Sequence, residues 1–110
     1  ALTFAKKAGT DPELVYQAIR GGLAGSTVMD AKAPMMLAGN YNPGFRIELH
    51  IKDLTNALNA AHAINSPVPL TAQMMEVMQF LKAEGCEKED HDSIVKYYEK
   101  ISGTSIVKKQ

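Results

Sequence analysis

The chain has 110 residues, the length of one ordinary domain, and 45% of them are apolar while 22% are charged, as is usual for a folded globular protein. Disordered and fibrous classes are thereby excluded, and a single domain is expected. Twelve Lys plus Arg balance twelve Asp plus Glu, so net charge gives no reason to expect a nucleic-acid or membrane-surface partner.

The cysteine content and the lengths of the apolar runs indicate the cellular compartment of the protein. The single cysteine, Cys86, excludes an internal disulfide, and its acidic neighbours in AEGCEKED do not favour a thiolate. No apolar run approaches the ~20 residues of a membrane span, and ALTFAKKAG lacks the ordered regions of a signal peptide. The sequence therefore predicts a cytoplasmic protein.

Frequent Ala, Leu and Met, with only short runs that alternate at period two, predict an all-α fold. The first helix, ALTFAKKAG, begins at Ala1 and ends at Gly9, and no residue precedes it that could act as an N-cap. We therefore expect that the chain begins inside a helix of a larger protein, although a frayed natural terminus would look the same.

The second predicted helix has the clearest boundaries. Asp11 suits the N-cap, Pro12 the first helical position, and the Gly21-Gly22 pair the end. Its predicted apolar face consists of Leu14, Val15, Ala18 and Ile19.

A third helix is predicted from Ser26 or Thr27, either of which would act as its N-cap. Pro34 lies within it and should kink or split it, because proline has no backbone N–H to donate. The following NYNPGF is predicted to be a turn, since Asn, Pro and Gly each suit non-helical backbone.

Two amphipathic helices should follow this turn. One runs to about Ile64, because apolar residues recur at spacings of four, three, four and three; they are Ile47, Ile51, Leu54, Leu58 and Ala61. The next follows Thr71 and ends at Gly85, and its predicted core residues are Met74, Val77, Met78 and Leu81.

The last helix should be capped by Asp90 or Asp92. We expect it to bury Ile94, one of Tyr97 and Tyr98, and Ile101. The tail GTSIVKKQ is predicted to be loose.

Few residues indicate chemistry directly. His50, His62 and His91 lack the spacing of a metal-binding pair, and Cys86 has no partner at zinc-finger spacing, so no metal site is expected. A Ser-His-Asp triad would rest on composition alone. The cluster of Met74, Met75 and Met78 would suit a partner-binding surface, although methionines at helical spacing are more often core.

Lys52 and Asp53 interrupt the apolar pattern and have two interpretations. In the simpler one, Lys52 forms an exposed ion pair with Glu48, one helical turn earlier. In the other, Lys52, Asn56 and Asn59 form a polar stripe beside a cleft for an anionic ligand, with Phe45 just ahead. The residues alone favour the ion pair.

Four stretches carry a resemblance: DPELVYQAIRGGLAGSTVMDAKAPMM, NPGFRIELHIKDLTNAL, PLTAQMMEVMQ and DHDSIVKYYEKI. In this order they resemble the C-terminal helical domain of the β-hydroxyacid dehydrogenases. The resemblance covers nearly the whole chain, and its most specific part is GFRIELHIKDL, with an aromatic residue, a helix and a Lys-Asp pair. It implies that residues 1–110 form an all-α, multi-helix C-terminal domain like those of 6-phosphogluconate dehydrogenase and the β-hydroxyacid dehydrogenases.

The resemblance also implies a function. An upstream Rossmann domain would bind NAD or NADP, and the helical domain would close the cleft of an enzyme that reduces tartronate semialdehyde to glycerate. Lys52 matches the family lysine near the nicotinamide end of the cofactor, Phe45 an aromatic that borders the same cleft, and Asp53 a carboxylate that supports the site. Family members associate through their helical domains, so a homo-oligomer is expected.

Two features of the family pattern are missing from the chain. Neither the glycine-rich cofactor fingerprint nor the catalytic lysine is present, and Lys6 and Lys7 do not match that lysine. We therefore expect no catalytic residue within this chain and no turnover by the chain alone. The rival hypothesis is a non-catalytic helical module for protein interaction or dimerisation that uses the methionine and tyrosine surfaces.

Overall fold

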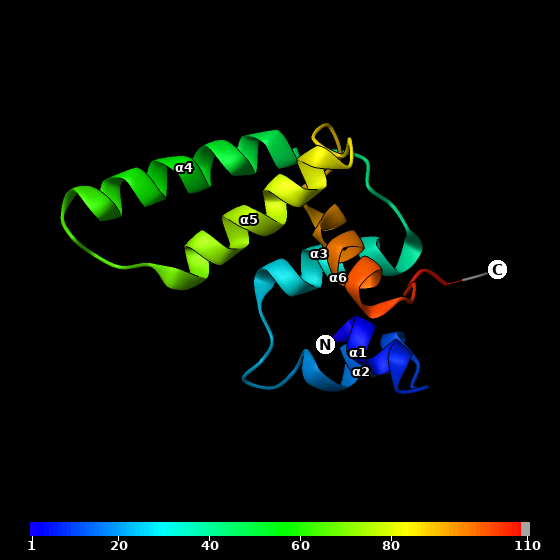
Figure 1. The fold of residues 1–110 in the computed structure, drawn as a ribbon. Coiled ribbons are helices and arrows are strands. Elements are labelled where there is room, and N and C mark those ends of the chain that lie inside the picture. The colour runs from blue at the N-terminus through cyan, green and yellow to red at the C-terminus, as the bar shows by residue number, and fades with distance from the viewer. Residues whose placement is uncertain (109–110) are drawn as a thin grey trace. The chain divides into compact units, whose positions relative to one another are not determined.

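The computed structural model describes residues 1–108, and these are mainly helical (Figure 1). The helices are α1 (Leu2–Lys7), α2 (Pro12–Ile19), α3 (Thr27–Ala38), α4 (Ile47–Ala63), α5 (Pro69–Ala83), the 3-10 helix η1 (His91–Ile94) and α6 (Val95–Ser102). Within the described part, β-type pairing is limited to an isolated bridge between Arg46 and Asp90. The all-α fold class is thus confirmed.

The contacts divide the chain into two compact units. Unit 1 comprises Ala1–Tyr41 and the segment from Val95 onward, whereas unit 2 is the continuous stretch Asn42–Ile94. None of the helices within residues 1–108 combines the length and the apolar composition needed to cross a membrane.

The predicted boundaries of α1 and α2 are confirmed. The backbone after α1 turns at Gly9, whose φ of +83° is the left-handed conformation that glycine adopts most easily. Asp11 is the N-cap of α2, and its Oδ1 accepts a hydrogen bond of 2.9 Å from the Glu13 N–H.

The predicted buried face of α2 is partly wrong. Leu14 and Ala18 are exposed, Val15 and Ile19 are half-buried, and the buried residues are Pro12 and Tyr16. Tyr16 can replace the aliphatic stripe because its ring enters the core while its hydroxyl keeps a polar partner, the Asp30 carboxylate.

Helix α3 begins as predicted, with the Ser26 Oγ accepting from the Met29 N–H. The prediction that Pro34 splits this helix is wrong, because α3 continues without interruption to Ala38. Proline removes only one main-chain hydrogen bond, the one to the Asp30 carbonyl, and both residues are exposed, so water can reach that carbonyl.

The core of unit 1 includes part of the chain that was predicted to be loose. Its buried members are Tyr16, Ala33, Leu37, Val95 and Ile106. Ile106 is only 2% exposed, its N–H donates to the Glu99 carboxylate, and the Lys108 N–H donates to the Leu37 carbonyl. The prediction is therefore wrong for residues 103–108, while Lys109 and Gln110 lie outside the described residues.

Unit 2 is built on α4 and α5, which run antiparallel and side by side (Figure 1). The bounds of α4 agree with the prediction to within a residue. Helix α5 begins at Pro69, earlier than predicted, and is followed by Gly85 at φ +83°, as predicted.

The predicted apolar stripes of unit 2 form its core. Of the α4 stripe, Ile47 is fully buried and the other four residues are half-buried. The buried core cluster consists of Ile47, Met78, Leu81 and Cys86, with Ile51, Leu54, Phe80 and Ile94 packed against it.

The last predicted helix is replaced by η1 followed by α6. Asp90 starts η1, because its Oδ2 accepts from the Asp92 N–H and its carbonyl from the Ser93 N–H. The prediction that Ile101 is buried is wrong, since Ile101 is 63% exposed and Val95 is the buried residue of α6. A 3-10 turn has 3.0 residues per turn, so its presence shifts the helical phase of the residues that follow.

Candidate functional site

Phe45, a predicted cofactor-binding residue, lies in the loop of unit 2 that leads into α4. Its side chain is half-buried. The ring centroid lies 5.5 Å from that of His91, in an edge-on arrangement, and 6.0 Å from that of His50. The three rings form an aromatic cluster in which Phe45 is the apolar member.

His50 and His91 meet in this cluster, which the sequence did not predict. Their Nδ1 atoms are 3.1 Å apart, so one ring must donate to the other. They lie 41 positions apart in the sequence, and no short-range spacing indicates such a contact. Residues 1–108 contain no group of three or more His, Cys, Asp or Glu placed to hold a metal ion.

Asp90 is a buried acidic residue that contacts the backbone of the Phe45 loop. Its residue surface is fully buried, and its Oδ1 accepts hydrogen bonds of 2.9 Å from the N–H groups of Gly44 and Phe45. The sequence predicted that Asp90 or Asp92 caps a helix, but it did not predict the contact of Asp90 with the Phe45 loop. The residues around Asp90 contain no pattern that predicts hydrogen bonds to residues about 45 positions away.

Lys52 and Asp53 lie side by side on α4. The Lys52 Nζ and the Asp53 Oδ1 are 3.3 Å apart, and the two side chains are 62% and 53% exposed. Asn56 and Asn59, the other predicted members of the polar stripe, are also exposed. The stripe is thus present on the surface of α4, where a ligand or another domain can reach it.

The predicted ion pair between Glu48 and Lys52 is wrong. The Glu48 carboxylate accepts instead from the Lys88 Nζ, at 2.9 and 3.1 Å, and contacts the Arg46 Nε at 2.9 Å. The hydrogen bond from Lys88 is the main cause that lowers the pKa of Glu48 below its usual 4.5. Glu48 therefore stabilises the start of α4, and Lys52 forms its ion pair with Asp53 instead.

The three predicted site residues come from one loop-helix segment of unit 2. Phe45 offers a half-buried aromatic face, and Lys52 offers an exposed ammonium group. Such a pair suits a ligand that joins a flat ring to negative charge, because the ring can pack on Phe45 and the charge can attract Lys52.

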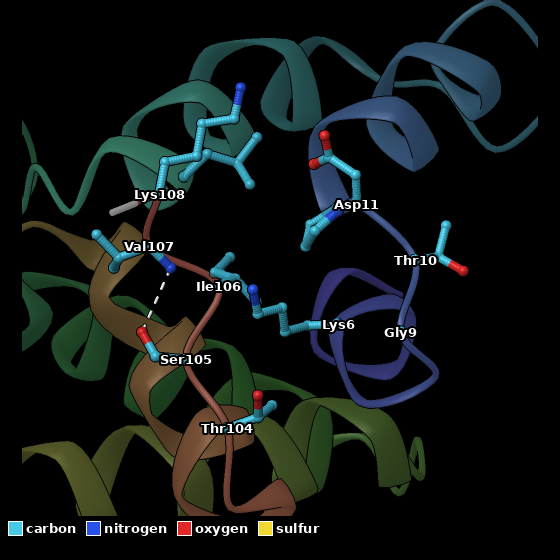
Figure 2. A pocket seen from close by; sticks show the side chains of 11 residues that line it. Lys6, Gly9, Thr10, Asp11, Thr104, Ser105, Ile106, Val107 and Lys108 are labelled. Atoms are coloured by element: carbon cyan, nitrogen blue, oxygen red, sulfur yellow. Dashed lines mark hydrogen bonds between the residues drawn. The ribbon is translucent and has the colours of Figure 1, made fainter. Parts of the chain in front are cut away.

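Unit 1 contains a cavity of about 780 Å³ that holds none of the predicted site residues. Figure 2 shows the Lys6 side chain extending from α1 toward Ile106 of the C-terminal segment. The wall opposite α1 and the 9–12 turn is formed by residues 104–108, where the Ser105 Oγ accepts from the Val107 N–H.

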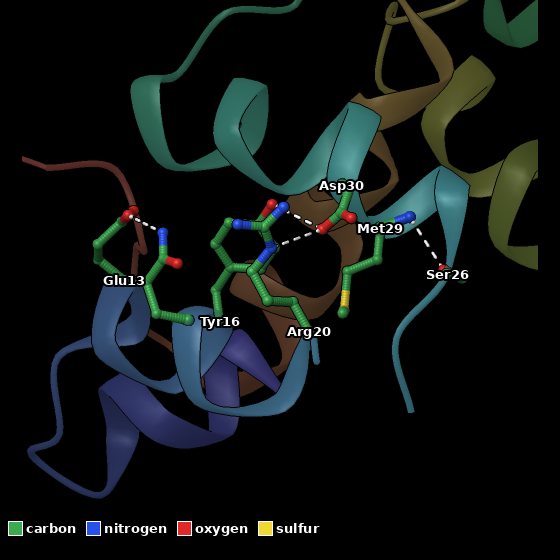
Figure 3. Close-up of polar contacts among 7 residues, drawn as sticks. Glu13, Tyr16, Arg20, Ser26, Met29 and Asp30 are labelled. Atoms are coloured by element: carbon green, nitrogen blue, oxygen red, sulfur yellow. Dashed lines mark hydrogen bonds and ion pairs between the residues drawn. The ribbon is translucent and has the colours of Figure 1, made fainter. Parts of the chain in front are cut away.

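A polar network joins α2 to α3 in the same unit (Figure 3). The Asp30 Oδ1 accepts from the Tyr16 hydroxyl at 2.9 Å and from the Arg20 Nε at 3.1 Å. The Arg20 hydrogen bond, followed by that from Tyr16, lowers the pKa of Asp30, whereas burial is the first cause that raises the pKa of Tyr16. This network holds the two helices together and lies in the unit that lacks the predicted site.

Comparison with known proteins identifies the family. Residues 1–98 match the profile of a family described as "NAD-binding of NADP-dependent 3-hydroxyisobutyrate dehydrogenase". The chain belongs to this hydroxyacid dehydrogenase family. The resemblance stated from the sequence is therefore confirmed.

Individual relatives agree with this membership. The chain is 41% identical over 99 residues to 2-hydroxy-3-oxopropionate reductase of Escherichia coli (strain K12), covering 90% of this chain and 34% of that protein. It is 32% identical over 107 residues to 2-(hydroxymethyl)glutarate dehydrogenase of Eubacterium barkeri, covering 96% and 36%. The chain thus spans about a third of the length of these curated relatives.

A solved structure supports the fold. The crystal structure of 3-hydroxyisobutyrate dehydrogenase from Salmonella typhimurium matches with a TM-score of 0.82 and 22% identity, over 86% of this chain and 33% of that one. The chain therefore has the helical fold found in about a third of that structure. The roles of Phe45, Lys52 and Asp53 stay predictions.

Proposed function

We propose that the chain is the C-terminal helical domain of a two-domain, NAD(P)-dependent reductase that converts tartronate semialdehyde to glycerate. The observation that carries this proposal is the 41% identity to 2-hydroxy-3-oxopropionate reductase over 90% of the chain. The family description, which names NAD and NADP, supports the cofactor class. The Rossmann domain would supply the remaining two thirds of the enzyme.

Lys52 and Phe45 are the residues of this chain that we place against the cofactor. The exposed Lys52 ammonium suits the anionic dinucleotide, and its ion pair with Asp53 limits the directions in which the flexible side chain can point. The half-buried Phe45 ring suits the flat nicotinamide end. Asp53 therefore acts as the supporting residue.

The chain's part in the reaction is binding and positioning. Reduced nicotinamide supplies a hydride to the aldehyde carbon when it is bound. The carbonyl oxygen also needs a proton, and we propose that its donor is a lysine of the upstream helix rather than Lys6 or Lys7. The chain alone would then show no turnover, because positioning without a proton donor and a bound hydride donor is insufficient.

Self-association through the helical domain is part of the proposal. Large apolar side chains are exposed in both units, including Phe4 at 78% in unit 1 and Ile64 at 76% in unit 2. Apolar side chains at this exposure would be available to a second copy of the chain if they form part of a larger contact surface. A cytoplasmic homo-oligomer is the assembly we propose.

A domain exchange tests the function. In the test chimera, this chain replaces the matching third of the Escherichia coli reductase, so that a Rossmann domain and the upstream helix are present. We expect the chimera to oxidise NADH or NADPH when tartronate semialdehyde is added, and the isolated chain to remain inactive. A folded chimera that binds cofactor without reducing the aldehyde would favour the non-catalytic helical module.

A further inference from the structure

Two segments of unit 2 that are far apart in sequence are joined along their backbones. The Ile47 N–H donates to the Glu89 carbonyl at 2.9 Å, and the Glu48 N–H donates to the Glu87 carbonyl at 3.1 Å. The His91 N–H donates to the Phe45 carbonyl at 2.7 Å. The loop before α4 and the segment before η1 are therefore fixed against each other at several successive residues.

Both oxygens of the Asp90 carboxylate add hydrogen bonds to this junction between residues 44–48 and 87–92. Oδ1 accepts from the N–H groups of Gly44 and Phe45, and Oδ2 accepts from the Asp92 N–H at 3.0 Å. The residue is fully buried. These N–H donors replace water around a buried carboxyl group, whose burial would be costly without hydrogen-bond partners.

Phe45 is consequently held at its amide, its carbonyl and its ring. Asp90 binds the amide, the His91 N–H binds the carbonyl, and the imidazoles of His50 and His91 contact the ring. The same junction sets the start of α4, the helix that carries Lys52. The position of the proposed cofactor-facing aromatic is thus decided by a residue 45 positions away.

The geometry points to Asp90 as a positioning residue of the reductase: its carboxylate holds Phe45 in place against the cofactor and acts on catalysis through that ring. This inference rests on the proposed function, since it takes Phe45 as the cofactor contact. Asp90 is fully buried and acts mainly through Phe45, so its effect on cofactor binding should become small when the Phe45 ring is removed.

Substitutions at Asp90 have graded structural consequences. Asp90→Ala removes the hydrogen bonds that the carboxylate accepts from Gly44, Phe45 and Asp92. In Asp90→Asn, the amide oxygen can still accept from the N–H groups of Gly44 and Phe45. The NH₂ group then faces the Asp92 N–H, and that hydrogen bond is lost because both groups are donors. Asp90→Asn should therefore preserve much of the Phe45 position that Asp90→Ala loses.

A double-mutant cycle in the chimera tests the inference. Asp90→Ala should raise the KM for NADH or NADPH about tenfold in the presence of Phe45, and by about twofold or less when Phe45 is already Ala. Asp90→Asn should fall between Asp90→Ala and the parent. Equal effects of Asp90→Ala in both backgrounds would overturn the inference and leave Asp90 a purely structural residue.

A matched control separates positioning from loss of stability. Asp11→Ala removes the N-cap of α2 in unit 1, so it should lower the melting temperature while leaving the cofactor KM unchanged. If Phe45→Ala alone changes neither KM nor kcat, the proposed role of Phe45 fails, and the inference fails with it. If Phe45→Ala is harmful and Asp90→Ala is harmless, the inference alone fails.

A measurement on the 110-residue chain does not depend on activity. Amide hydrogen exchange should show Gly44 and Phe45 protected in the parent and in Asp90→Asn, and unprotected in Asp90→Ala, while the α2 amides keep their protection. Unprotected Gly44 and Phe45 amides in the parent would contradict the junction and overturn the inference.

Discussion

Replacement of Ile106 by Ala tests whether the C-terminal segment is part of the core of unit 1. Ile106 is 2% exposed and packs with Tyr16, Leu37 and Val95. The substitution removes three carbon atoms, which at about 0.8 kcal/mol each amounts to about 2.4 kcal/mol of lost burial. The cavity left behind raises the expected cost to roughly 3 kcal/mol.

The measurement is chemical and thermal unfolding followed by circular dichroism. For a domain of this size, a loss of roughly 3 kcal/mol lowers the melting temperature by about 10 °C or more. Ile101→Ala is the matched control, because the same atoms are removed from a side chain that is 63% exposed, and it should change stability by about 0.5 kcal/mol or less. Equal effects of the two substitutions would refute the docking of the segment.

The remaining predictions concern charged groups. The pKa values of Asp30 and Glu48 are lowered in the folded chain from 3.8 and 4.5, so the unfolded chain takes up these protons first and stability should fall as the pH drops below these values. Acid unfolding of Asp30→Asn should depend less on pH in this range, and an unchanged profile would contradict the role of the Asp30 network. Lys52→Ala should leave the unfolding free energy of the chain within about 0.5 kcal/mol of the parent, because its pair with Asp53 is exposed. In the chimera, the same substitution should raise the KM for the cofactor about tenfold, and an unchanged KM would contradict the cofactor contact.

Several helix boundaries could be predicted because their signals are local. Asp11, Ser26, Gly9 and Gly85 act on backbone groups within a few residues, so the sequence alone identifies them. The stripe from Ile47 to Ala61 was predictable for the same reason, since a helix repeats its faces at a constant spacing. The resemblance of GFRIELHIKDL then identified the family that the comparisons confirm.

Contacts across the chain were the part that local patterns could not predict. Glu48 has Lys52 one turn away, yet it pairs with Lys88, because folding brings that ammonium within 2.9 Å. The meeting of His50 with His91 and the burial of Ile106 depend in the same way on distant segments. The proposed cofactor-binding residues could therefore be predicted only in part. Lys52 and Phe45 could be named from the sequence, but the Asp90 contacts that hold Phe45 could not.

The proposed function is tested most directly by the rate at which the chimera oxidises reduced cofactor with tartronate semialdehyde as the substrate. We expect turnover by the chimera, a raised cofactor KM after Lys52→Ala, and no turnover by the isolated chain. A folded, cofactor-binding chimera that leaves the aldehyde unreduced would contradict the proposed function.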